Sequence, residues 1–149
     1  MEIRSIIIIA ASLSILYSCS SGSADKKIPQ LADEMCDCFD GFQKDLSPPV
    51  IALLKQVSVA PNPRKEMQQG LAKLKSEEAE SFIEKFKQIS EKTSAVNKCM
   101  QEFDNRHGKE TTKDKQSLTL KLLKEMQQNK NCPAGAAVVN IGLQQQVVK

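Results

Sequence analysis

Two cysteines separated by a single residue, Cys36 and Cys38, constrain this chain more than any other feature of its sequence. They fall inside a segment whose apolar residues recur every three or four positions, the pattern of an α-helix with one buried face. These apolar residues are Ile28, Leu31, Met35, Phe39, Phe42 and Leu46. Residues two apart on a helix project about 200° apart around its axis. The two cysteines therefore cannot easily bond each other while the helix is intact, and each faces a different neighbour.

Two further cysteines, Cys99 and Cys132, lie far along the chain from this pair. Measured from the centre of the apolar stripe, Cys38 lies about 60° to one side and Cys36 about 100° to the other. This geometry predicts a first helix that is cross-linked on one flank to the segment around Cys99 and on the other to the chain near Cys132. Of the three ways to pair four cysteines, it disfavours the one that joins Cys36 to Cys38 and leaves the other two open.

Two structural disulfides are the leading interpretation of these cysteines, and a metal site and a redox site are the alternatives. The sequence lacks the paired CxxC motifs of structural zinc sites, and His107 is its single histidine, so no metal is expected. A redox pair at Cys36 and Cys38 would need a stabilised thiolate, which the acidic residues around them disfavour. Those acidic residues are Asp33, Glu34, Asp37 and Asp40.

The rest of the chain also carries helical patterns. Aromatic residues make up 4% of the sequence and tryptophan is absent, a composition that favours helices over a β-sandwich. Ser47 before Pro48 and Asn62 before Pro63 each place an N-cap residue before a proline in the first turn, which predicts a helix start at both prolines. The spacing of apolar residues after Pro63 shifts around Glu78, which indicates either a stutter in one helix or a break near Ser76.

These patterns predict an all-α domain, a small helical bundle of about four to five helices with one long helix, cross-linked by two disulfides. The predicted helices cover residues 28–46, 48–60, 63–107, 112–131 and 134–149. The last of these has the weakest pattern, because Gly135 and Gly142 interrupt it.

The start of the chain predicts export. The apolar run from Ile6 to Tyr17 is shorter than the roughly 20 residues that span a bilayer and has the size of the apolar part of a signal peptide, with Arg4 supplying positive charge before it. Leu16, Tyr17, Ser18 and Cys19 resemble the lipobox of bacterial lipoproteins. Tyr17 departs from that motif, whose corresponding position usually carries a smaller residue. A plain secretory signal and an N-terminal core helix are the alternatives.

The lipobox resemblance implies that residues 1–18 are removed as a signal peptide and that Cys19 becomes a lipid-bearing N-terminus, carrying acyl chains such as palmitate. Several buried acyl chains anchor a protein stably without a spanning helix. Residues 19–27 then form a flexible tether, and residues 28–149 a single α-helical domain. Removing Cys19 from the total of five cysteines leaves the even number that an oxidising compartment favours.

The mature part resembles the small, helical, cysteine-containing lipoproteins of unknown function in Bacteroidetes-type bacteria, which have a CxC in the first mature helix and a later Cys-Met, here Cys99 and Met100. That resemblance implies no activity. Ser20 stands where an aspartate would favour inner-membrane retention in enteric bacteria, so the analogy implies the outer membrane. The residues after Cys19 lack the acidic run associated with surface export, which implies a domain that faces the periplasm.

The functional prediction is an envelope-anchored lipoprotein with a non-enzymatic interaction or structural domain, which touches the membrane through Cys19 and binds an envelope protein. The net charge of +3 is too small to favour nucleic acid, and the sequence contains no phosphate loop, HExxH or nucleophile elbow. We therefore expect no cofactor and no catalytic residues. A hydrophobic ligand in a groove between helices, lined by Met35, Phe39, Phe86 and Met100, is the alternative. A thiol oxidoreductase that uses the CxC pair is the third.

Overall fold

The computed structural model of the chain describes residues 27–107 and 115–147. All regular secondary structure in these two ranges is helical, which confirms the predicted all-α class. The helices are residues 27–37, α2 (Asp40–Lys44), α3 (Pro48–Val59), α4 (Pro63–Leu71), α5 (Ser76–Ser90), α6 (Ala95–His107), α7 (Lys115–Gln128) and α8 (Pro133–Val147). None of these described helices is long and apolar enough to cross a membrane. The predicted signal peptide, Cys19 and residues 20–26 of the tether lie outside the described residues.

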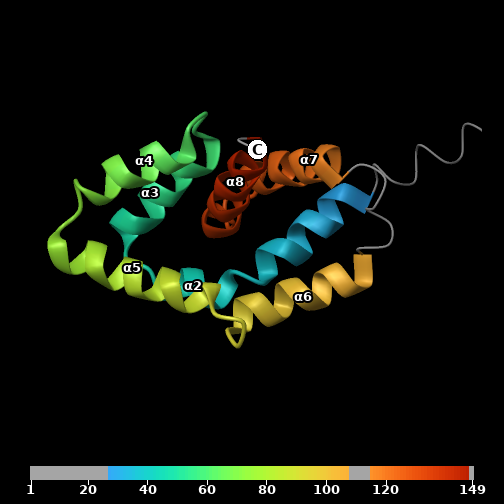
Figure 1. Cartoon of the computed structure of the whole chain (residues 1–149), viewed down its shortest axis with the longest axis horizontal. Helices are drawn as coiled ribbons and strands as arrows, with labels where there is room; N and C mark the ends of the chain where they lie inside the picture. The colour runs from blue at the N-terminus through green and yellow to red at the C-terminus, as the bar shows by residue number, and fades with distance from the viewer. Residues whose placement is uncertain (1–26, 108–114, 148–149) are drawn as a thin grey trace, which may run out of the picture.

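The centre of the fold is α8, which packs against α3 and α7 and also contacts α4. In Figure 1, α8 lies between the α3–α4 pair and α7, while α5 and α6 follow one another along the lower edge. The helix over residues 27–37 lies between α6 and α7 in the same view. Every residue from 132 to 137 is buried, and the small side chains of Ala134, Ala136 and Ala137 let the neighbouring helices approach closely.

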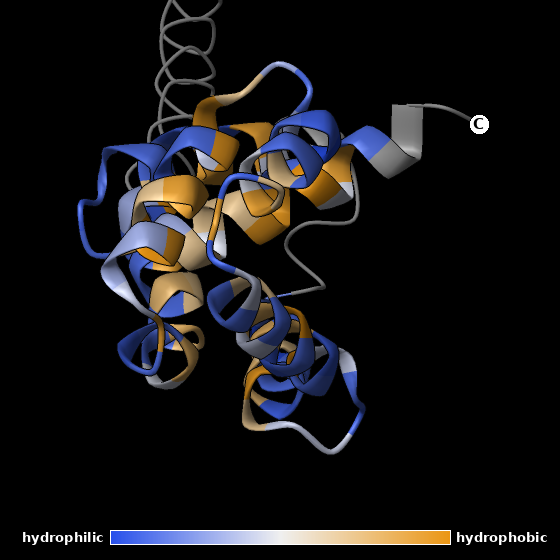
Figure 2. Ribbon diagram, turned by 90° about the vertical axis from the view of Figure 1, so that its left-hand side faces the viewer, coloured by the Kyte–Doolittle hydropathy of each residue, from blue (hydrophilic) through white to orange (hydrophobic). Residues whose placement is uncertain are grey.

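Buried side chains form two apolar clusters that share α8. In Figure 2, the hydrophobic (orange) stretches of the ribbon lie mostly where helices face one another, and most of the loops are hydrophilic (blue). The first cluster joins residues 27–37 to α6, α7 and α8, and includes Met35, Phe103 and Met126. The second joins α2, α3, α5, α6 and α8, and includes Phe42 and Phe82. Met100 packs against both clusters. The apolar stripe predicted for residues 28–46 therefore serves two separate parts of the core.

The first predicted helix, residues 28–46, is divided by a turn at Cys38 and Phe39. The backbone N–H of Phe39 donates to the carbonyl oxygen of Cys36 at 2.9 Å, a tighter bond than the i→i−4 bond of an α-helix. The chain becomes helical again in α2, where the N–H of Gln43 donates to the carbonyl of Phe39 at 2.8 Å. The prediction of one continuous helix was wrong here, because helical periodicity does not register a single tightened turn.

The segment predicted as one long helix, residues 63–107, is divided into α4, α5 and α6. The break before Ser76 is one of the two alternatives that the sequence left open. The second break, at residues 91–94, was not predicted. Ser94 causes it, because its hydroxyl donates to the carbonyl of Ile89 at 2.9 Å and accepts from the N–H of Asn97 at 3.1 Å. The hydroxyl thus supplies the N-terminal cap of α6. These two divisions raise the number of helices above the prediction.

Polar side chains from distant elements satisfy the ends of two central helices. Asn140 of α8 donates to the carbonyl oxygens of Val57, Ser58 and Ala60 at 3.0, 3.1 and 3.0 Å, which caps the C-terminus of α3. Gln43 of α2 accepts from the N–H of Ala134 at 3.2 Å and donates to the carbonyl of Asn131 at 3.0 Å. These bonds hold α2 against the start of α8.

Candidate functional site

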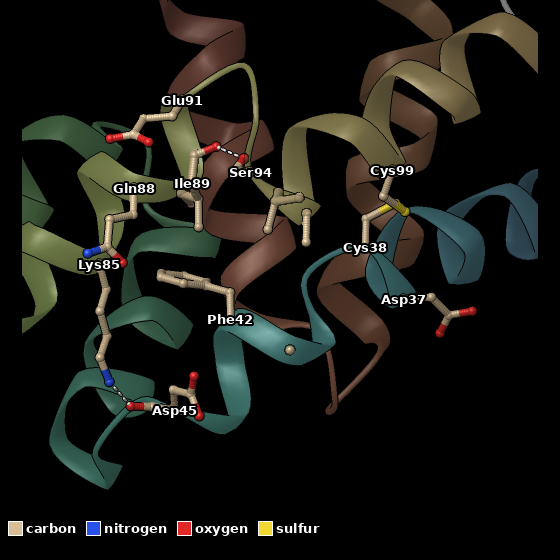
Figure 3. A pocket seen from close by; sticks show the side chains of 13 residues that line it. Asp37, Cys38, Phe42, Asp45, Lys85, Gln88, Ile89, Glu91, Ser94 and Cys99 are labelled. Atoms are coloured by element: carbon tan, nitrogen blue, oxygen red, sulfur yellow. Dashed lines mark hydrogen bonds between the residues drawn. A yellow bond between two sulfur atoms is a disulfide. The ribbon is translucent and has the colours of Figure 1, made fainter.

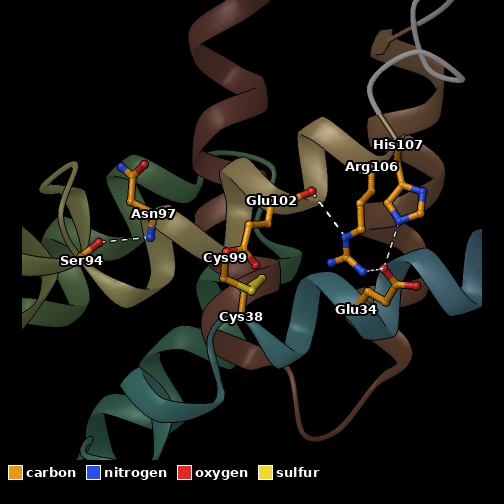
Figure 4. Close-up of a disulfide and its surroundings, with 8 residues drawn as sticks. All are labelled: Glu34, Cys38, Ser94, Asn97, Cys99, Glu102, Arg106 and His107. Atoms are coloured by element: carbon orange, nitrogen blue, oxygen red, sulfur yellow. Dashed lines mark hydrogen bonds and ion pairs between the residues drawn. A yellow bond between two sulfur atoms is a disulfide. The ribbon is translucent and has the colours of Figure 1, made fainter.

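Two disulfides join the region around the CxC motif to distant segments. Cys36 bonds Cys132, the residue before α8, with 5.3 Å between the Cα atoms. Cys38 bonds Cys99 of α6, with 5.5 Å between the Cα atoms. The predicted disulfides are therefore present, and the pairing is one of the two that the sequence left open. Figure 4 shows the second disulfide between α6 and the turn that follows residues 27–37.

The two disulfides differ in their access to solvent. Cys36 and Cys132 are 5% and 1% exposed and belong to the first apolar cluster. Cys38 is also buried, but Cys99 is partly exposed, and both sulfur-bearing side chains line an open cleft. One disulfide is therefore enclosed in the core and the other forms part of a surface site.

This difference predicts the order in which the disulfides are reduced. A thiolate must reach a sulfur atom before exchange can occur, so a mild reductant should open Cys38–Cys99 before Cys36–Cys132 in the native protein. The measurement is alkylation of freed thiols over a dithiothreitol series, followed by peptide mass spectrometry. In denaturing urea, the control, both bonds should open at similar rates. Simultaneous opening under native conditions would contradict the assignment of one enclosed and one accessible bond.

The cleft beside Cys38 and Cys99 has a volume of about 770 Å³, which is within the usual range for ligand sites. Residues from α2, α5, α6 and the bend between α5 and α6 line it (Figure 3). The apolar part of its lining consists of Phe42, Ile89, Ala95, Val96 and the disulfide. The bend at residues 91–94, which the cap at Ser94 produces, forms one side of this cleft.

The charged residues of the cleft are predominantly acidic. Asp37, Asp45 and Glu91 line it together with one lysine, Lys85. The Lys85 ammonium donates to the main-chain carbonyl of Asp45 (Figure 3). Among the residues that the structure describes, none of the three carboxylates forms an ion pair or a hydrogen bond. An apolar surface bordered by unpaired negative charge can hold a ligand that is both apolar and cationic.

The four residues predicted to line a hydrophobic groove are divided between two parts of the core. Met35 lies in the first apolar cluster, whereas Phe39 and Phe86 belong to the second or pack against it. Met35 and Met100 do line a separate cleft of about 380 Å³ between residues 27–37, α6 and α7. The turn at Cys38 and Phe39 sends Met35 and Phe39 into different clusters, so a ligand groove lined by all four residues stays a prediction.

His107 has a partner that the sequence did not reveal. Its Nε2 lies 3.0 Å from a carboxylate oxygen of Glu34, and Arg106 lies 3.3 Å from the same oxygen. The His107 ring also packs on Phe103, with 4.9 Å between the ring centroids. These contacts tie the end of α6 to residues 27–37 (Figure 4). Glu34 and His107 are 73 positions apart, so no local pattern could have indicated the pair.

The described residues contain no group of three or more His, Cys, Asp or Glu side chains that could hold a metal ion. Sequence reasoning missed the acidic cleft, since Lys85 in α5 and Glu91 directly after it lie far along the chain from Asp37 and Asp45. Comparison of the chain with protein-family models, with curated proteins and with solved structures finds no match.

Proposed function

We propose that this chain is a lipoprotein of the bacterial envelope, anchored through Cys19 at the outer membrane and facing the periplasm, whose helical domain binds an envelope protein and catalyses no reaction. The lipobox-like residues Leu16–Cys19 and the polar residues after them support the anchor. The acidic, partly apolar cleft supports the binding role.

The observation that carries this proposal is the position of the disulfides relative to the tether. The first described helix begins where the predicted tether ends, and it bears Cys36, with Cys38 in the turn that follows. These cysteines bond Cys132 and Cys99, so the element nearest the anchor is covalently joined to both α6 and the start of α8. Force on a membrane anchor would therefore be passed to the body of the domain through covalent bonds. An oxidising compartment is also where such bonds persist.

Replacement of Cys19 tests the anchor. We expect Cys19→Ala to abolish incorporation of labelled palmitate and to release the protein from the membrane fraction, since the acyl chains on Cys19 are the proposed hold on the bilayer and no helix in the described part of the chain is long and apolar enough to span it. Ser20→Ala is the matched control and should keep both label and membrane retention. Failure of the wild-type chain to take up label, or retention of Cys19→Ala in membranes, would refute the proposed anchor.

Crosslinking tests the partner role. Wild-type protein crosslinked in intact envelopes should give discrete adducts with a reproducible partner. Recovery of free protein alone under several crosslinkers would count against an interaction domain. A thiol oxidoreductase, the third candidate, predicts disulfide exchange with glutathione at Cys36 and Cys38.

A small hydrophobic ligand remains the second candidate because of the cleft of about 380 Å³ lined by Met35, Met100, Phe103, Leu118 and Leu122. A ligand that binds the native state raises its melting temperature by mass action. A thermal-shift screen with fatty acids and other hydrophobic compounds distinguishes this candidate from the protein-binding domain, which should show no such shift.

A further inference from the structure

The lining of the cleft beside the Cys38–Cys99 disulfide includes Gly41, which borders open space. A Cβ atom placed on Gly41 would meet no heavy atom of another part of the protein within 4 Å. Gly41 lies within α2, and its φ is not positive, so its backbone conformation does not require glycine. Phe42 beside it is buried, while Ile89 and Cys99 of the lining are partly exposed. A ligand can therefore reach apolar side chains and the disulfide from the surface.

The carboxylates of the cleft are spread around its edge. In Figure 3, Glu91, Asp45 and Asp37 lie at separate positions, with Phe42 and Ile89 between them. They do not converge as ligands of one ion would, in agreement with the absence of a metal-holding group among the described residues. A single small cation could neutralise one of them and leave the others unpaired. An extended ligand with several positive groups could pair with all three while its apolar groups cover the lining.

We propose that this cleft binds a short polypeptide segment of an envelope protein, in which apolar side chains alternate with lysine or arginine. This inference rests on the proposed function for the existence of a partner and adds the chemistry of the segment that is recognised. The apolar side chains of the segment cover Phe42, Ile89 and Val96, and its cations face Asp37, Asp45 and Glu91.

The test uses the full chain as cells process it, held in phosphatidylcholine nanodiscs if it carries a lipid and in buffer if it does not. Phosphatidylcholine has no net charge, so it does not attract the lysines of the peptide, and empty nanodiscs measure any binding of its leucines to the lipid. The probe is a short fluorescent peptide that alternates leucine and lysine. One comparison peptide has glutamate for lysine, and another has serine for leucine. Binding is followed by fluorescence anisotropy at low and high salt.

Two leucine substitutions form a matched pair of variants. Gly41→Leu fills the cleft, whereas Gly142→Leu on α8 enters another space in which a Cβ also meets nothing within 4 Å. Both replace a helical glycine by a better helix former, so melting temperatures should not fall. We expect Gly41→Leu to weaken binding of the leucine–lysine peptide about tenfold or more, and Gly142→Leu to leave it unchanged.

Charge variants test the recognition independently of cleft filling. Asp37→Asn combined with Glu91→Gln removes two exposed carboxylates without altering the core, and should weaken binding about threefold or more at low salt. Both comparison peptides should bind about tenfold more weakly than the leucine–lysine peptide.

Several outcomes would overturn the inference: no binding of the leucine–lysine peptide, equal binding of the glutamate peptide, or equal weakening by Gly41→Leu and Gly142→Leu. The lipid state of the purified chain is determined separately by mass spectrometry. If the chain carries no lipid but binds the peptide through the cleft, the proposed anchor is refuted and this inference is retained. If the chain carries a lipid but does not bind the peptide, the anchor is retained and this inference is refuted.

Discussion

Replacing both Cys36 and Cys132 by alanine is expected to lower the free energy of unfolding by about 5 kcal/mol. The two cysteines are 96 positions apart, and in the chain-entropy model such a cross-link contributes about 4.7 kcal/mol by restricting the unfolded chain. They are also 5% and 1% exposed, so removing their sulfur atoms leaves unfilled space in the core. Since small domains have a total stability of about 5 to 15 kcal/mol, this variant should be close to unfolding. Urea denaturation followed by circular dichroism measures the change.

The matched control removes the other disulfide, with Cys38 and Cys99 replaced by alanine. Those cysteines are 61 positions apart, so the chain-entropy contribution is about 4.3 kcal/mol. The difference in loop length is worth only about 0.4 kcal/mol, and burial therefore decides which variant is less stable. We expect the Cys36/Cys132 variant to unfold at the lower urea concentration. If either variant has the same denaturation midpoint as the oxidised wild-type protein, the disulfide that this variant lacks does not stabilise the fold as described.

Met126→Ala is expected to lower the free energy of unfolding by about 3 kcal/mol, within the range of about 2 to 5 kcal/mol for deleting a fully buried methionine side chain. Met126 is fully buried in α7, within the first apolar cluster. Its Cε is 3.0 Å from the position that a Cβ on Gly135 would occupy, and the sulfur of Cys132 is equally close to that position. Met126 thus fills the space where α7 meets the start of α8. Thermal and urea denaturation measure the loss.

Two substitutions on the same helix serve as controls. Met126→Leu conserves most of the side-chain volume and should cost less than about 1.5 kcal/mol. Leu120, which is 52% exposed, should tolerate alanine with a change of about 0.5 kcal/mol or less. If Leu120→Ala destabilises the protein as much as Met126→Ala, the described packing of α7 on α8 is wrong.

Local sequence patterns correctly predicted the starts of α3 and α4. Asn62 before Pro63 begins α4, and the Asn62 side chain accepts from the N–H of Lys65 at 3.2 Å. Ser47 before Pro48 likewise marks the start of α3, although its hydroxyl makes no capping bond. Such signals act within one turn, so the sequence alone reveals them. The break before α6 also has a local cause in Ser94. The helical spacing of Ile89, Thr93 and Val96, four and then three residues apart, concealed it.

The candidate cleft could not be predicted in the same way. Its acidic residues lie at the end of the first described helix, after α2 and after α5, and they share one site because of how those helices pack. Gly41 is a weak point of the helix predicted over residues 28–46, since glycine disfavours helix interiors. Gly41 borders the open space of the cleft, and residues 91–94, far along the chain, form another side of that cleft.

The sequence by itself determined the helical class, because apolar spacing of three and four residues specifies which face of each segment is buried. It also disfavoured a bond between Cys36 and Cys38, because residues two apart on a helix face opposite sides, although the structure places Cys38 in the turn that follows the helix. Tertiary structure alone decided between the two other pairings and placed α8, the segment with the weakest pattern, at the centre of the fold. The first half of α8, residues 133–139, is apolar on all sides, so it has no preferred face, and its position is set by the neighbours that enclose it.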